Sequence, residues 1–198
     1  MKHLKLFEEF EGEHISSHLK GRGIDPFKTR VVIDEETEDV YFFLYNLSGQ
    51  MVGYQKYNPN YVKTGQSNLD NPKMAKYFTW VSDEDKGKKI AVWGLESTQF
   101  TDKFLFVTEG IFDAVRIQEA GYPAIAVLCN DPSDSLKSWI ATLPQKKIVI
   151  YDNDRAGRKL RKIGDFSYTV PSGKDANDLT PEEAKIFLEE CLINSGLK

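Results

Sequence analysis

The chain has 198 residues, of which 40% are hydrophobic and 28% are charged, close to the average of globular proteins. This length can bury a core in one large domain or in two smaller lobes. No run of about 20 apolar residues occurs, so the sequence holds no candidate membrane-spanning helix. The net charge is −4, and the halves either side of residue 100 each carry 13 basic and 15 acidic residues, which excludes a basic tail for nucleic acid.

The cysteines and the N-terminus both indicate a cytoplasmic protein. Cys129 and Cys191 lie far apart in apolar stretches, which is typical of buried, reduced thiols. The first five residues lead into acidic residues and not into an apolar run, unlike a secretion signal.

The first hundred residues predict an α+β lobe. Five apolar residues recur at roughly helical spacing between residues 1 and 20, before Gly21 and Gly23: Leu4, Phe7, Phe10, Ile15 and Leu19. Short β-like segments follow at 30–34, 40–45 and 50–54, and the turn 46–49 predicts a hairpin between the last two. Residues 58–75 are rich in Asn, Pro, Gly and Ser, which predicts a loop.

Residues 101–198 predict an α/β domain with a mainly parallel sheet. Strands are expected at 104–108, 124–129, 147–151 and 166–170. Helices are expected at 111–120, 135–142, 155–163 and 181–195. Strands that alternate with helices favour parallel pairing with right-handed crossovers.

Acidic residues follow three of these strands. Ligands of parallel sheets collect beyond the carboxyl ends of the strands, so the side chains are expected at one rim. In extended backbone, Asp152 and Asp154 would project to the same side. The six candidates are Glu109, Asp113, Asp152, Asp154, Asp175 and Asp178.

Such a cluster favours a divalent metal site. Crowded carboxylates raise one another's pKa, so the cluster is costly without cations. Oxygen-only ligands suit Mg²⁺ or Mn²⁺ and not zinc, and two such ions can serve phosphodiester chemistry. A single Asp after a strand is more often a turn former or helix cap, but three acidic strand ends together favour metal.

A basic stretch follows Asp154. Five of the eight residues 155–162 are Lys or Arg. They form either a solvated helix face or a phosphate-binding element, and Arg155 and Arg158 are the candidates because Arg pairs with phosphate oxygens bidentately.

The segments 109–114, 151–158 and 173–179 resemble the Toprim family, and the middle one is similar to bacterial-type primases in particular. The resemblance implies an acid/base role for Glu109 and a metal-binding pair in Asp152 and Asp154. It implies further that Asp113 and Asp175 complete the acidic rim. Primases often have a second Asp where this chain has Asn177, so either Asp178 substitutes or the last metal ligand is absent.

A weaker resemblance to the primase catalytic core extends upstream through 17–24, 41–54 and 75–95. It implies nucleic-acid or nucleotide binding by Lys76 and Lys86, and by Lys174 in the last Toprim segment. The usual zinc-binding and helicase or helicase-binding domains have no room in 198 residues. The expected partners are therefore single-stranded DNA, NTPs and a separate helicase or zinc-binding template-reading protein.

Three functions remain open from the sequence. The first is a minimal primase core that makes RNA primers by metal-dependent nucleotidyl transfer, which the primase-like first hundred residues favour. The second is a Toprim nuclease, because the carboxylates serve both reactions. The third is a non-catalytic subunit that docks on a helicase or template-reading partner, against which the full acidic set argues.

Overall fold

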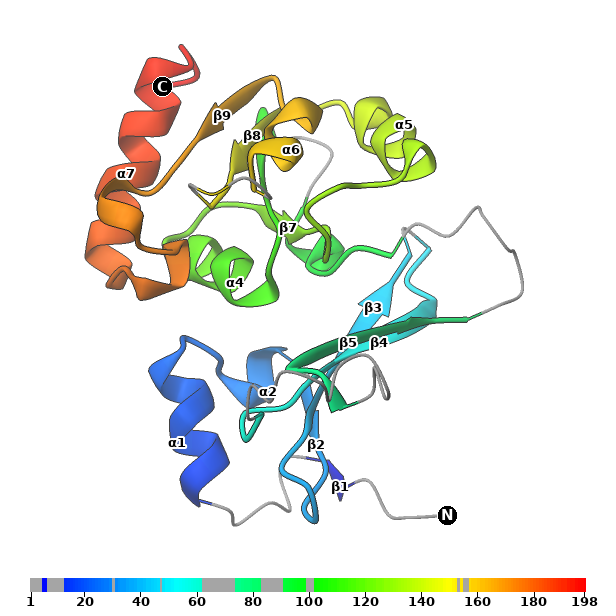
Figure 1. Cartoon of the computed structure of the whole chain (residues 1–198). Helices are drawn as coiled ribbons and strands as arrows, with labels where there is room; N and C mark the ends of the chain where they lie inside the picture. Colours follow the sequence, from blue (N-terminus) through cyan, green and yellow to red (C-terminus); the bar gives the residue numbers. More distant parts are fainter. Residues whose placement is uncertain are drawn as a thin grey trace. The chain divides into compact units, whose positions relative to one another are not determined.

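The chain divides into two units, Met1–Glu84 and Asp85–Lys198, each of which is described by itself (Figure 1). The computed structural model describes residues 5–6, 13–29, 31–46, 48–61, 74–82, 91–98, 102–152, 154 and 157–198. The lobes expected at 1–100 and 101–198 differ from these units in the stretch 85–100. Its described part, 91–98, belongs to the second unit, where Trp93 and Ala126 exchange backbone hydrogen bonds of 2.9 and 3.0 Å.

The first unit is built on an antiparallel sheet with strand order β1-β2-β3-β4-β5. Along β3, Val40, Phe42 and Leu44 are buried while Tyr41 and Phe43 are half-exposed, as expected of a sheet with one covered face. The strands are β1 (Lys5–Leu6), β2 (Val31–Ile33), β3 (Val40–Tyr45), β4 (Met51–Tyr57) and β5 (Tyr77–Val81).

The described part of this unit contains the helices α1 (Glu13–Gly21) and α2 (Pro26–Thr29). Ile15 and Leu19 of α1 are buried, and His18 of the same helix stacks on Tyr57 of β4 and hydrogen-bonds to its hydroxyl at 2.8 Å. Helix α1 therefore packs on the sheet face that carries Tyr57.

The predicted hairpin 40–54 is confirmed, since β3 and β4 pair antiparallel. The helix predicted from residue 1 is wrong at Lys5 and Leu6, which pair with Ile33 and Val32 as a strand. Pairing with an open sheet edge outweighed the helical spacing there. Strand β5 was not predicted, and most of the predicted loop 58–75 lies outside the described residues.

The second unit has a parallel sheet with strand order β7-β6-β8-β9, and the predicted α/β class is confirmed. The strands are β6 (Phe104–Thr108), β7 (Ala124–Ala126), β8 (Lys146–Ile150) and β9 (Phe166–Tyr168). The helices are α4 (Ile111–Glu119), α5 (Asp134–Thr142), α6 (Gly157–Leu160) and α7 (Pro181–Asn194). Among the residues that the structure describes, this unit also has the 3-10 turns η4 (Leu95–Ser97), η5 (Arg161–Ile163), η6 (Pro171–Gly173) and η7 (Ala176–Asp178).

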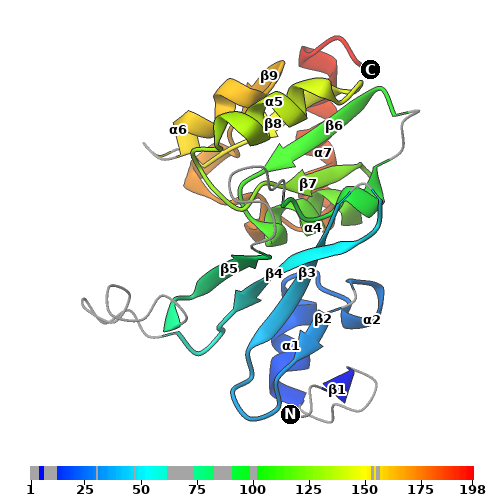
Figure 2. The same cartoon turned by 90° about the vertical axis from the view of Figure 1, so that its right-hand side faces the viewer.

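Helices cover both faces of this sheet. Helices α5 and α6 lie on one side and α4 and α7 on the other (Figures 1 and 2). Leu136 and Ile140 of α5 and Leu160 of α6 join the core formed by one sheet face, with Val107 and Val149 at its centre. Because all four strands run parallel, their carboxyl ends meet at one edge.

Several predicted elements change length in the structure. Strand β7 ends at Ala126 although the apolar run continues to Cys129, and Leu128 has the left-handed φ of 61°. The predicted helix 155–163 divides into α6 and η5 in its described part. Among the described residues, no helix is long and apolar enough to cross a membrane.

Candidate active site

Glu109 stands at the carboxyl end of the central strand β6. Its backbone carbonyl accepts the Leu128 N–H at 2.9 Å, and the preceding Thr108 carbonyl accepts the Val127 N–H at 3.0 Å. The Thr108 hydroxyl donates to the Gly110 carbonyl at 2.9 Å, which fixes the turn into α4. Hydrogen bonds therefore fix the backbone before, at and after Glu109, and this fixes the point from which its half-buried side chain extends.

Asp152 and Asp154 lie in a tight turn after β8. The Asp154 N–H donates to the Asp152 carbonyl at 2.7 Å, which closes a three-residue turn. The expectation of extended backbone is therefore wrong at Asp152 and Asp154, because a hydrogen bond between residues two apart requires a turn. The Oδ1 atom of Asp154 accepts the Gly157 N–H at 2.6 Å and so caps the start of α6.

Gly157 is required by the close packing of this turn. A Cβ atom at Gly157 would lie 2.3 Å from the Asp152 carbonyl oxygen and 2.9 Å from the Asp152 nitrogen. Both atoms are backbone, so no flexible side chain can move away. The absence of a side chain at Gly157 thus lets α6 start directly against the acidic turn.

The third acidic strand end is the turn 175–178, which is tied to α4. The Asn177 N–H donates to Oδ1 of Asp113 at 3.0 Å, and the Asp175 N–H donates to Oδ2 of Asp178 at 3.1 Å. Arg116 of α4 also reaches the Asn177 carbonyl at 3.5 Å. Asp113 and Asp178 therefore each use one carboxylate oxygen to hold this turn, while Asp175 is exposed.

Four carboxylates of the rim interact electrostatically, and Asp152 interacts with each of the other three. The pKa of Glu109 is raised, first because partial burial removes water from its carboxylate and then because Asp152 and Asp154 are negative. The pKa of Asp152 is raised by partial loss of hydration, and further by Asp175 and Asp154. The structure thus brings Asp152 within electrostatic range of Glu109, Asp154 and Asp175, and Glu109 within range of Asp154.

This donor set fits a partly hydrated Mg²⁺ or Mn²⁺ ion. In the described part of the chain, no three Asp, Glu, His or Cys side chains converge into a ready-made metal cage. Mg²⁺ at enzyme sites keeps several waters and is usually held by one or two carboxylates together with substrate phosphates. Oxygen donors in mutual repulsion meet that requirement and do not meet the nitrogen and sulfur preference of zinc.

The basic candidates are only partly described. Arg158 and Lys174 are exposed on the second unit, and the Arg158 N–H donates to the Asp154 carbonyl at 3.3 Å. Lys76 is exposed on the first unit, 5.5 Å from the centre of the Tyr77 ring. Lys86 and Arg155 lie outside the described residues.

Comparisons with known proteins point to one group. No family model matches the chain. A DNA primase of Thermotoga maritima is 25% identical over 185 residues, which are 88% of this chain and 30% of that protein. The zinc-binding and RNA polymerase domains of the Aquifex aeolicus primase superpose with a TM-score of 0.68 at 20% identity, covering 93% of this chain and 56% of theirs. A DnaG primase catalytic domain bound to single-stranded DNA gives 0.60 at 20% identity, with 96% and 62% covered.

The chain has the Toprim-containing fold of a bacterial-type primase core. The likeness runs through both units, because the matches cover 88% or more of the chain. It spans only about a third of the length of the curated primase that it matches.

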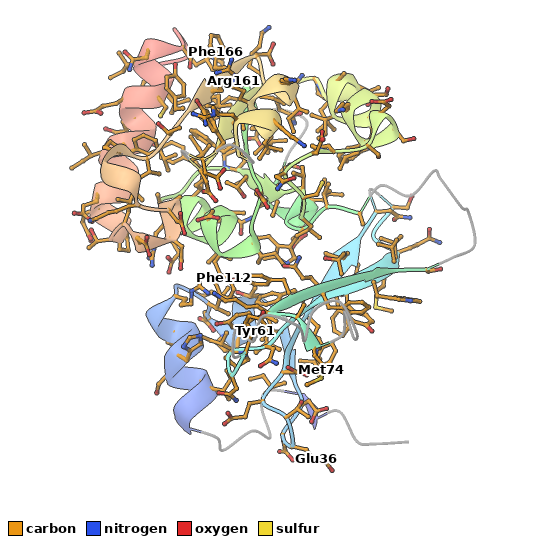
Figure 3. All side chains as sticks on the ribbon, viewed as in Figure 1. Glu36, Tyr61, Met74, Phe112, Arg161 and Phe166 are labelled. Atoms are coloured by element: carbon orange, nitrogen blue, oxygen red, sulfur yellow. The ribbon has the colours of Figure 1, made fainter. Side chains whose placement is uncertain are left out.

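Within this primase fold, Asn177 departs from the expected acidic pattern. Its backbone N–H binds Asp113, and its side-chain amide donates to the Phe112 carbonyl at 3.4 Å. Phe112 is marked on α4 in Figure 3. Asn177 therefore fastens the acidic turn to α4, and metal binding by Asp178 stays a prediction.

Two positioning residues of the primase fold were missed in the sequence. Gly157 had a signal, since a glycine soon after Asp-x-Asp permits close backbone approach. Leu128 had no such sequence signal, because leucine rarely adopts a positive φ and its neighbours in the sequence do not indicate a left-handed residue. The strained Leu128 backbone hydrogen-bonds to the Glu109 carbonyl, and backbone strain of this kind is often found at functional sites.

Proposed function

We propose that the chain synthesises short RNA primers on single-stranded DNA by metal-dependent nucleotidyl transfer. The observation that carries this proposal is the likeness to DNA primases through both units and not only through the Toprim-like unit. The alternative function, a nuclease that uses the same acidic rim, would not explain why the first unit is also similar to primases.

In the proposed reaction a ribonucleotide 3′-hydroxyl attacks the α-phosphate of an incoming NTP, and pyrophosphate leaves. Bound Mg²⁺ or Mn²⁺ ions would supply charge neutralisation for the triphosphate and acidify the attacking hydroxyl. Asp152 and Asp154, which one turn holds together, are the residues that would supply carboxylate oxygens to such ions.

Glu109 is the proposed acid/base group. Its backbone is fixed on two sides and the pKa of its carboxyl is raised by burial and by Asp152 and Asp154. A carboxylate with a raised pKa is a better proton acceptor than an ordinary one. The exposed Arg158 and Lys174 are proposed to contact phosphate oxygens, since cations beside the metals offset the triphosphate charge.

The template and partners follow from the same proposal. Lys76 would contact single-stranded DNA from the first unit, and Lys86 and Arg155 keep the nucleic-acid and nucleotide roles assigned from the sequence. Asp113, Asp175 and Asp178 remain proposed members of the metal rim. A zinc-binding template reader or a helicase is the proposed partner, as the Aquifex primase carries a zinc-binding domain beside its polymerase domain.

The test is incorporation of labelled NTPs on single-stranded DNA with Mn²⁺ or Mg²⁺, run beside nicking of the same DNA without NTPs. Template-dependent RNA products support primer synthesis. Nicking without incorporation identifies a nuclease, and DNA binding without either product identifies a non-catalytic subunit. Either of these two results contradicts the proposal.

A further inference from the structure

The face of the first unit's sheet that does not pack on α1 is rich in aromatic side chains. Cross-strand register places Tyr54 opposite both Phe43 and Trp80, and Lys56 opposite both Tyr41 and Phe78. Directly opposed residues project to the same face. We name this surface the aromatic face, and its rings are Tyr41, Phe43, Tyr54, Phe78 and Trp80.

The rings of the aromatic face form a row across three strands. Tyr41 meets Tyr54 edge-on with centroids 5.4 Å apart, and Tyr54 stacks on Trp80 at 5.6 Å and 24°. The row ends on the edge strand β5, where Trp80 is 43% exposed. Stacking on Tyr54 of the adjacent strand holds the exposed Trp80 ring in place before any ligand binds.

Charges near the aromatic face lie at its Tyr41 end, where Asp39 and Asp34 add to the effect of burial in raising the pKa of the Tyr41 hydroxyl. Lys56 forms a largely buried ion pair with Asp39 at 2.8 Å, so this pair adds no net charge. Carboxylates gather in the β2–β3 turn, where Figure 3 marks Glu36 at the tip, and the described β3–β4 turn residues are neutral. Lys76 is exposed directly before β5, and its ammonium lies 5.5 Å from the centre of the Tyr77 ring, which belongs to the opposite face.

We propose that the aromatic face binds the bases of single-stranded nucleic acid by stacking, with Trp80 as the outermost ring. Sheets that present aromatic rings hold two or three unstacked bases in this manner. The inference rests on the proposed function, which supplies a single-stranded template. It adds a base-stacking surface on the first unit to the acidic rim of the second.

Other occupants fit less well. A peptide that extended the sheet would pair with the open backbone of β5 and would leave the face rings unused. Duplex DNA keeps its bases stacked inside, so it offers phosphates but no π-face to Trp80. Stacking on bases therefore predicts a preference for single strands that duplex of equal charge does not share.

The test is binding of a short end-labelled oligothymidylate to the full chain in EDTA, followed by the fluorescence anisotropy of the label, which serves wild type and Trp80 variants alike. In the wild type, quenching of tryptophan fluorescence gives a second readout that reports mainly on Trp80, because Trp93 is buried and Trp139 is half-buried. An abasic oligonucleotide of equal length keeps the phosphates and removes the bases. The difference in affinity between the two oligonucleotides measures base stacking, and it should persist at high salt because phosphate contacts weaken there.

Two variants of the same strand form a matched pair. Trp80→Leu should weaken oligothymidylate binding about tenfold or more and bring it to the abasic level. Trp80→Phe, which keeps a ring, should retain most of the affinity and guards against misfolding. Tyr77→Leu is the control, since Tyr77 is 41% exposed on the opposite face, and it should keep the base-dependent difference.

Equal affinity of wild type and Trp80→Leu for oligothymidylate overturns the inference, and so does an equal loss in Tyr77→Leu. Because EDTA removes metals, the result does not depend on catalysis. If the wild type makes primers but shows no base-dependent binding, the proposed function is supported and the stacking surface is contradicted. A wild type that binds bases at Trp80 without making primers leaves the stacking surface standing alone.

Discussion

Glu109 combines two properties that oppose each other in the metal-free protein. Its position at the end of β6 suits proton transfer at the rim, yet partial burial and two neighbouring aspartates make its charge unfavourable. A carboxyl whose pKa rises on folding takes up protons on folding. It therefore destabilises the fold above its folded-state pKa, and the penalty vanishes below the unfolded value of about 4.5.

The first prediction follows from this sign. Without metal, Glu109→Gln should unfold at a temperature equal to or higher than wild type at pH 7, and the difference should shrink as pH falls toward 4. Thermal melts in EDTA across this pH range measure it. The exposed Glu190→Gln should show no such pH-dependent gain. A Glu109→Gln variant that is less stable than wild type at neutral pH would mean that its carboxylate is not crowded.

Asp113 has a hydrogen-bonding role that its assignment to the metal rim did not include. Its Oδ1 atom accepts the Asn177 N–H, so it positions the turn that carries Asp175. Asparagine keeps an oxygen acceptor at this place and alanine does not.

The second prediction therefore compares two substitutions. Asp113→Asn should keep most of the nucleotide incorporation, whereas Asp113→Ala should lose about 1 kcal/mol of stability and much of the activity. Chemical denaturation and incorporation assays give the two quantities. If Asp113→Asn instead loses activity as completely as alanine at normal stability, the negative charge of Asp113 matters more to activity than its support of the turn.

The elements around the site differ in how well the sequence predicts them. Strand β6 was predicted at its full length because four apolar residues in succession, followed by a β-branched threonine, suit a strand buried on both faces. Strand β5 was missed because it is an edge strand with three exposed residues, so no alternation marks it. Lys5 and Leu6 follow helical spacing and still join the sheet, since pairing with β2 is a contact that local periodicity cannot reveal.

The site was predicted in part for a similar reason. Parallel strand ends predict that Glu109, Asp152 and Asp175 share an edge, and the structure places Asp152 within electrostatic range of the other two. The turn that joins Asp152 to Asp154 depends on the close approach of Gly157, and the left-handed Leu128 depends on pairing with Glu109. The turn and the Leu128 conformation both result from contacts between different segments of the chain. Such contacts cannot be predicted from local sequence patterns.

The third prediction concerns the approach of α6 to the acidic turn. Gly157→Ala forces a methyl group against the Asp152 backbone, so the turn must shift and stability should fall by about 2 kcal/mol. Nucleotide incorporation should fall further than stability explains, because Asp152 and Asp154 move. Gly21→Ala is the control, since Gly21 has open space around its Cα and no positive φ. Native activity in Gly157→Ala would show that the turn tolerates displacement.

For the whole chain, the balance of charge at the rim links metal binding to stability. Cations that bind only the folded form stabilise it by mass action. The fourth prediction is that millimolar Mn²⁺ raises the melting temperature of the wild type, and that Asp152→Asn blunts the rise.

Asp165→Asn provides the control for this metal response. Asp165 is held by the Lys147 N–H at 2.8 Å and by the Lys146 ammonium at 2.9 Å. Burial alone would raise the pKa of Asp165, but these bonds outweigh it and the pKa is lowered. Its loss should lower the starting stability above pH 4 and leave the Mn²⁺ response intact. A wild type whose melting temperature ignores Mn²⁺ and Mg²⁺ alike would contradict metal binding at the rim.

The most direct test of the account is template-dependent RNA synthesis by wild type and Glu109→Gln under one set of conditions. Glutamine keeps the shape of the side chain and removes the proton-accepting charge. We predict comparable thermal melts and a fall in NTP incorporation on single-stranded DNA of about 10²-fold or more, as expected for the loss of an acid/base group. Incorporation by Glu109→Gln at the wild-type rate would contradict the account at its central residue, whatever the other carboxylates do.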